Sequence, residues 1–226
     1  MDTSLIGALG LGFLLGLRHA LDVDHVAAVS TFVSQERSVL RSCLRGTFWG
    51  LGHTLALLVA GVAVVAFKLQ VSAELERGLE RVVGLVLIGL GGHVLLRTFG
   101  VRLHRHEHAH EGMRHRHLHV HVGEPGAHRH AHLWRGARQP LLMGLLHGLA
   151  GSGALVLLVL TTMPSPAAAA IYLLVFGMGS TVGMLILGGL IGVPFAHTAG
   201  RSRTVATGLQ VVVGTGGILV GALMLV

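Results

Sequence analysis

The 226-residue chain is too apolar for a water-soluble domain, because 52% of its residues are hydrophobic and only 12% are charged. The formal charge of +7 does not indicate nucleic acid, since aromatic residues make up only 4% and the arginines lie between apolar segments. A single cysteine, Cys43, excludes an intramolecular disulfide. We therefore expect a protein whose main partner is the lipid bilayer.

Six long apolar segments predict an all-α, polytopic membrane protein with six transmembrane helices. They lie at about 4–33, 46–67, 82–99, 140–163, 167–196 and 204–226. Most of them reach the roughly 20 residues that a helix needs to cross the hydrocarbon core. The first is about 30 residues long, whereas two helices of about 14 residues would each be too short to cross. We expect the first span to be one interrupted helix.

Arginines concentrate in alternate loops and so predict the orientation in the membrane. The first, third and fifth loops contain most of them: Arg37, Arg41 and Arg45, then eight from Arg97 to Arg138, then Arg201 and Arg203. The second loop carries Lys68, Arg77 and Arg81, and the fourth has no basic residue. Because basic residues favour the cytoplasmic side, we expect a plasma-membrane protein with the odd loops in the cytoplasm and both termini outside.

Three short patterns of the first half recur in the same order in the second half. Gly16–Leu21 aligns with Gly144–Leu149, Gly50–Thr54 with Gly177–Thr181, and Gly89–Gly92 with Gly214–Gly217, at offsets of 128, 127 and 125 residues. Because each copy contains three spans, an odd number, the second copy enters the membrane inverted. Inverted repeats are typical of transporters, whose sites lie on discontinuous helices.

This repeat divides the chain into three parts. We expect a first three-helix repeat at 1–99, a central loop at 100–138, and a second, inverted three-helix repeat at 139–226. Glycines in the segment Gly148–Gly153 predict that the fourth span is interrupted as well.

The stretch Arg18–His25 places two imidazoles and two carboxylates inside an apolar span. Ionisable groups are costly in hydrocarbon, so such a group predicts a functional site. His19, Asp24 and His25 suit a borderline divalent cation such as Ni²⁺, Co²⁺ or Zn²⁺, which favours imidazole nitrogen and accepts carboxylate oxygen. Asp22 either pairs with Arg18 at i, i+4 or joins the ligands, and we favour the pairing.

His53 and His147 are the further intramembrane candidates. At about 1.5 Å rise per residue, they fall with His19 in one layer in the inner half of the bilayer. His25 joins this layer only if the helix breaks near Leu21 or is tilted. Each histidine could instead be a core residue bonded to a carbonyl; the common layer favours a ligand role for His53 and leaves His147 open. The second half also offers three hydroxyl groups near this layer: Ser152, Ser180 and Thr181. The candidate metal residues are His19, Asp22, Asp24, His25, His53 and His147.

The central loop holds eleven of the seventeen histidines. They are His104, His106, His108, His110, His115, His117, His119, His121, His128, His130 and His132. Short histidine-rich tracts bind borderline metals, and this arginine-rich background leaves too little apolar surface to form a core. We expect a disordered cytoplasmic loop that binds metal; the alternative is a solvated basic loop whose only role is topology.

Two motifs together resemble the nickel/cobalt transporter family. Arg18–Val26 is similar to its His-x4-Asp-His signature, and Phe48–Thr54 to its second, Gly-His-Ser/Thr motif. The six-span layout and His147–Gly153 look closer to the small urease-accessory-like branch of that family. The resemblance implies transport of Ni²⁺ or Co²⁺, with His19, Asp24, His25 and His53 among the binding positions. Where the longer permeases have an acidic third motif, Phe176–Thr181 lacks the carboxylate.

We therefore predict alternating-access transport of Ni²⁺ and/or Co²⁺, with no cofactor beyond the transported ion. A Zn²⁺ transporter and a membrane-anchored metal sensor or storage protein are the alternatives. An enzyme is not expected, because the chain has no His-Glu-x-x-His motif and no acidic residue evidently free to act as a general base. The pattern leaves homo-oligomerisation open.

Overall fold

The computed structural model describes residues 3–67, 72–110, 113–122, 133–150 and 165–226. Within them lie seven helices and one two-stranded sheet: α1 (Thr3–His19), α2 (Val23–Val33), α3 (Val39–Phe67), α4 (Ala73–Thr98), β1 (Val101–His110), β2 (Met113–Val122), α5 (Leu133–Ala150), α7 (Pro166–Thr198) and α8 (Arg203–Leu223). Four of these helices, α3, α4, α7 and α8, are long and apolar enough to cross a membrane. The expectation of a polytopic helical membrane protein is confirmed.

The first apolar segment is broken, as its length predicted. α1 ends at His19 and α2 begins at Val23, and the turn between them contains bonds from the Leu21 amide to the Arg18 carbonyl and from the Asp22 amide to the His19 carbonyl. The predicted interruption of the fourth span, at Gly148–Gly153, falls where the described residues of α5 end, and residues 151–164 lie outside the described part.

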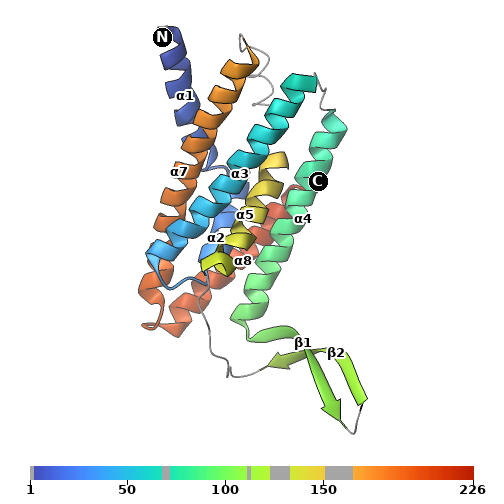
Figure 1. Cartoon of the computed structure of the whole chain (residues 1–226). Coiled ribbons are helices and arrows are strands. Elements are labelled where there is room, and N and C mark those ends of the chain that lie inside the picture. Colours follow the sequence, from blue (N-terminus) through green and yellow to red (C-terminus); the bar gives the residue numbers. More distant parts are fainter. Residues whose placement is uncertain (1–2, 68–71, 111–112, 123–132, 151–164) are drawn as a thin grey trace.

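α3 and α7 lie side by side and form the centre of the bundle (Figure 1). α1 lies along α7, α5 lies along α3, and α4 pairs with α8. In the view of Figure 1 the chain descends through α1, α2, α4 and α7 and ascends through α3, α5 and α8. Each helix of the second half that is drawn therefore runs opposite to its counterpart in the sequence alignment.

Glycines allow the central helices to touch backbone to backbone. A methyl group at Gly16 would overlap the carbonyl oxygen of Phe176, and one at Gly144 would overlap the carbonyl oxygen of Trp49. No larger residue fits such positions unless the helices separate. This close approach of α1 to α7 and of α5 to α3 brings polar residues of α1, α3 and α5 into one layer.

The central loop, for which disorder was expected, contains a β-hairpin whose strands are residues 101–110 and 113–122. β1 and β2 pair antiparallel, with His104 opposite His119, His106 opposite His117 and His108 opposite His115. The physical reason is the His-x-His spacing, whose period of two matches the alternation of a strand. The hairpin lies beyond the lower ends of the helices (Figure 1).

Three helices start earlier than the apolar segments predicted. α3 begins at Val39, α4 at Ala73 and α5 at Leu133. Each first turn contains a charged residue: Arg41 in α3, Glu74 in α4 and Arg135 in α5. The backbone hydrogen bonds of a helix form outside the hydrocarbon as well as inside it. Hydropathy marks the part of a helix that lies in lipid, and not the whole helix.

Candidate metal centre

His19 lies where α1 ends, at the break in the first span. Its Nε2 is 3.2 Å from Nε2 of His53, and its Nδ1 is 2.7 Å from Oδ2 of Asp22. A carboxylate can only accept a hydrogen bond, so Nδ1 of His19 donates to Asp22, and the lone pair of its Nε2 accepts from Nε2 of His53. Asp22 therefore pairs with His19, and the favoured pairing with Arg18 is wrong. The side chain of Asp22 is 54% exposed, which makes it an orienting partner outside the buried cluster.

Asp24 and His25 occupy the first turn of α2. The carboxylate Oδ1 of Asp24 accepts from the backbone amide of His25 at 2.9 Å and from its Nδ1 at 3.0 Å. Its other oxygen, Oδ2, accepts from Nε2 of His147 at 2.7 Å. Asp24 thus connects a histidine of α2 to one that is 123 positions away in the sequence.

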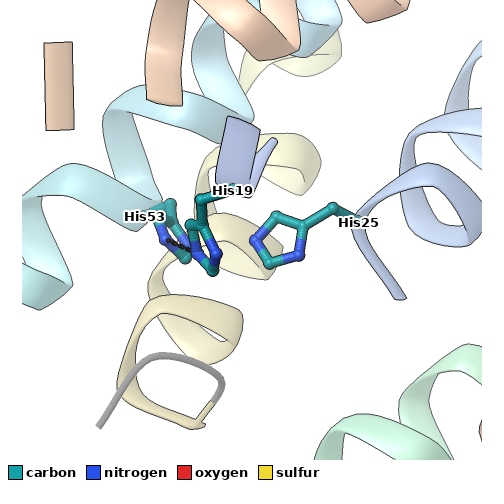
Figure 2. Close-up of side chains that lie close together, drawn as sticks. All are labelled: His19, His25 and His53. Atoms are coloured by element: carbon teal, nitrogen blue, oxygen red, sulfur yellow. Dashed lines mark hydrogen bonds between the residues drawn. The ribbon is translucent and has the colours of Figure 1, made fainter. Parts of the chain in front are cut away.

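His25 is fully buried and lies in the middle of the cluster. Its ring centroid is 4.4 Å from that of His19, 5.1 Å from that of His53 and 4.4 Å from that of His147. One ring nitrogen of His25 faces His19 and His53, and the other is turned away from them (Figure 2). Within the described residues its Nε2 has no hydrogen-bond partner, and an unpaired polar atom in the interior costs about 1–3 kcal/mol.

The three histidines His19, His25 and His53 have a geometry that fits a metal ion. One nitrogen of each lies within 4.8 Å of the others. Two nitrogens bound tetrahedrally to one ion at about 2.0–2.1 Å are about 3.3 Å apart, close to the 3.2 Å between His19 and His53. A cation at this point would also supply the missing partner of His25 Nε2.

His147, on α5, makes a second set with Asp24 and His25, again with ligand atoms within 4.8 Å of one another. The side chain is buried, and its Nε2 contacts a carboxylate and not a backbone carbonyl. His147, which the sequence left open as a ligand or a core histidine, thus contacts Asp24 within the cluster.

The loop histidines and the hydroxyl groups lie apart from this contact network. The hairpin carries eight of the loop histidines, at 104, 106, 108, 110, 115, 117, 119 and 121, whereas His128, His130, His132 and Ser152 lie outside the described residues. Ser180 is fully buried in α7. Thr181 lies beside Thr54 where α3 contacts α7, and their Oγ1 atoms are 3.0 Å apart.

Two aromatic residues that the sequence did not single out enclose the cluster. The ring of Trp49, which is buried, lies 5.2 Å from that of His25 and 5.3 Å from that of His147. The ring of Phe176 lies 5.5 Å from that of His19. Trp49 precedes His53 by one helical turn, a spacing that places both on one face of α3 and was available in the sequence. Such walls exclude water and strengthen charge interactions inside.

The fold is that of a polytopic membrane protein, and its buried imidazoles and carboxylate form a cluster that could hold a metal ion. A family model described as high-affinity nickel-transport protein matches residues 5–201, and the chain belongs to this family. It is accordingly a transport protein and not an enzyme.

Named relatives agree with this membership. The chain is 38% identical over 202 residues to the urease accessory protein UreH of Bacillus sp. (strain TB-90), covering 89% of this chain and 83% of that protein. It is 26% identical over 186 residues to the chloroplast protein FOR GROWTH AND FERTILITY 2 of Arabidopsis thaliana, covering 81% of this chain and 46% of that one. A high-affinity nickel transport protein of Cupriavidus necator is 34% identical over 83 residues, covering 35% and 24%. No solved structure matches the chain.

Proposed function

We propose that this protein carries Ni²⁺, or Co²⁺, across the membrane through the buried cluster of His19, Asp24, His25, His53 and His147. The observation that carries the proposal is the convergence of these side chains from α1, α2, α3 and α5 around one fully buried imidazole. Imidazole suits nickel, cobalt and zinc, and a carboxylate offsets part of the charge of a divalent ion. Asp22, bonded to His19 from outside the cluster, orients that ligand.

The transport cycle that we propose is alternating access between two inverted three-helix halves, with six spans in all. The matching contacts of aligned residues support it: Gly16 meets the Phe176 carbonyl as Gly144 meets the Trp49 carbonyl. The third helices of the two halves, α4 and α8, also contact each other through glycines: a methyl group at Gly84 would meet the Gly221 carbonyl, and one at Gly221 the Gly84 carbonyl. Helices that touch through such smooth surfaces can pivot as rigid bodies.

In this cycle the cation exchanges its water shell for protein ligands at the cluster. Moving a divalent ion into a low-dielectric interior is expensive unless ligands replace the water and a negative charge is nearby. Imidazole nitrogens take the place of water, and Asp24 supplies the charge. Trp49 and Phe176 keep bulk water away, so the ion leaves only when the halves rearrange. We further propose that both termini lie outside and that the histidine-rich hairpin is cytoplasmic and binds metal before or after passage.

Zinc is the second candidate cargo. Affinity of such ligand sets rises through the Irving–Williams order, and selectivity comes from coordination geometry. The 3.2 Å spacing of the His19 and His53 nitrogens matches the tetrahedral arrangement that zinc prefers, so zinc belongs in the same assay.

The test is cation flux into proteoliposomes for Ni²⁺, Co²⁺ and Zn²⁺, comparing the wild type with His19→Ala and with a deletion of residues 101–122. We expect the flux of Ni²⁺ or Co²⁺ to fall by about 100-fold in His19→Ala. Loss of an outer-shell partner costs up to about this much, and His19 is a direct ligand in this proposal. The flux should persist in the deletion variant. His93→Ala, an exposed histidine of α4, is the matched control and should retain full flux. No flux of any cation in the wild type, with metal binding lost on removing the hairpin, would mean a metal sensor or store.

A further inference from the structure

We propose that the centre holds two overlapping metal positions that share His25, and that the ion passes from one to the other during a transport cycle. The first position consists of His19, His25 and His53, and the second of Asp24, His25 and His147. This inference rests on the proposed transport function and adds a route through the site.

The geometry of His25 separates the two positions. An imidazole has two nitrogens on different ring edges, and each can bind one ion. Nδ1 of His25 lies 3.0 Å from Asp24 Oδ1, whereas Nε2 has no partner among the described residues. The nitrogen facing His19 and His53 in Figure 2 is therefore the one not engaged by Asp24. An ion bound on this edge lies on the far side of the ring from the carboxylate.

The five side chains form two groups of three that share His25, and within each group the ligand atoms lie within 4.8 Å of one another. The ring centroids of His53 and His147 are 6.3 Å apart, whereas each ring is closer to His25, at 5.1 Å and 4.4 Å. His25 therefore lies between the two outer histidines. Metal–nitrogen bonds of about 2.0–2.1 Å allow one ion to bind His25 together with either neighbour set.

The two positions differ in charge and in the helices that build them. The first offers three imidazoles and no formal charge, and the second includes the carboxylate of Asp24. A divalent ion in a low-dielectric site is held more strongly next to a carboxylate, so the second position binds more tightly. The first takes its outer ligands from α1 and α3, the second from α5, and only α2 serves both. A shift of α2 relative to these helices would open one set while closing the other.

The hydrogen bonds of the ion-free cluster indicate which of the two positions an ion fills first. Asp22 and Asp24 accept from Nδ1 of His19 and Nδ1 of His25, so the lone pairs of both Nε2 atoms are turned to the first position. There Nε2 of His19 accepts from Nε2 of His53, and Nε2 of His25 has no partner among the described residues. At the second position Asp24 is already engaged by His147. An incoming ion therefore binds first at His19, His25 and His53, where it displaces only the bond between two imidazoles. It reaches the second position by replacing the Asp24–His147 contact. In that step the proton on Nδ1 of His25 moves to Nε2, which the ion has left, and the proton on Nε2 of His147 moves to Nδ1 or to water.

The experiment is a Co²⁺ titration of the purified full-length protein, followed by its visible d–d absorption. The variants are His53→Ala, which removes the first position, His147→Ala, which removes the second, the double variant, and His25→Ala, which removes both. The hairpin histidines are present in every variant, so subtracting the His25→Ala spectrum cancels their contribution. The corresponding glutamine variants repeat the test with side-chain volume largely kept, in case an alanine variant does not fold.

We expect His53→Ala and His147→Ala each to retain His25-dependent Co²⁺ binding. Their spectra should differ, because one ligand set combines a carboxylate with two imidazoles and the other consists of three imidazoles. The double variant should match His25→Ala, and flux should fall at least about tenfold in both single variants, as for loss of one metal partner. Identical difference spectra, or loss of all His25-dependent binding in either single variant, would overturn the two-position proposal. Absent flux in wild-type vesicles would instead overturn the transport function, while the spectra would still count the positions.

Discussion

The two halves of the molecule have the same helix contacts but different chemistry. Aligned positions of α3 and α7 carry His53 and Ser180, both fully buried, and one turn earlier Trp49 and Phe176. The backbone carbonyl of each aromatic residue packs against a glycine of the other half. His53 points a ring nitrogen at His19, whereas the Ser180 hydroxyl has no partner among the described residues. Contacts that shape the bundle occur twice, and the ligands are concentrated in the first half.

This difference separates two kinds of constraint. Backbone contact between helices requires glycine in both halves, since any side chain would force the helices apart. A metal site needs several donor atoms around one point in the molecule. The second half therefore does not need its own copy of each ligand. α5 accordingly contributes a single histidine, His147, to a cluster otherwise built by α1, α2 and α3.

The largest expected effect contrasts His53 with its aligned partner Ser180. His53→Ala should lower Ni²⁺ or Co²⁺ flux by about 100-fold, because it removes one of three donors. Ser180→Ala should leave flux within about twofold, since its buried hydroxyl makes no bond that the alanine would lose. Flux in proteoliposomes measures both. Equal losses in the two variants would mean that the halves contribute equally to the site.

The shared packing predicts equal losses of stability in the two halves. Gly16→Ala and Gly144→Ala should each lower the free energy of unfolding in detergent by about 1–3 kcal/mol, as overpacking does. Thermal unfolding of the purified protein measures this. Gly92→Ala is the control, because a methyl group there would meet nothing within 4 Å and alanine favours a helix over glycine. If Gly16→Ala were as stable as Gly92→Ala, the backbone contact of α1 with α7 would be wrong.

Substitution of Asp24 should weaken metal binding more than substitution of Asp22. Asp22→Ala removes the acceptor that orients His19, and should weaken Co²⁺ binding by about tenfold, the lower end for an outer-shell partner. Asp24→Asn removes the only charge inside the cluster and should weaken binding more. Difference spectra against His25→Ala report the affinity of the centre alone. A larger effect at Asp22 would place that residue among the direct ligands.

The smallest effect concerns Thr54 and Thr181, where the two halves meet. Thr54 donates to the Gly177 carbonyl at 2.9 Å and accepts from Thr181 at 3.0 Å. Thr54→Val, which loses both bonds, should cost about 1–3 kcal/mol of stability, and Thr181→Val about 1 kcal/mol. Because the residues share a bond, the double variant should cost less than the sum. Strict additivity in thermal unfolding would show that the hydroxyl groups do not interact.

Much of the site was predictable from residue type and spacing, and the exceptions have identifiable causes. The break near Leu21 followed from a segment too long for one span and too short for two. The aromatic walls were missed because Trp49 and Phe176 look like ordinary core residues until their neighbours are known. The hairpin at 101–122 was missed because composition was weighed above the two-residue period of the histidines.

The sequence by itself determined the membrane environment and the residue types that a metal site could use, because hydropathy and side-chain chemistry are properties of single residues and their neighbours. Only the tertiary structure decided which ligands meet. The contact between Asp24 and His147 joins positions 123 residues apart, and it depends on how closely α5 approaches α3 at Gly144. The assignment of Asp22 to His19 likewise depends on the turn after α1. Such pairings are set by helix packing in three dimensions, which residue spacing along one helix does not encode.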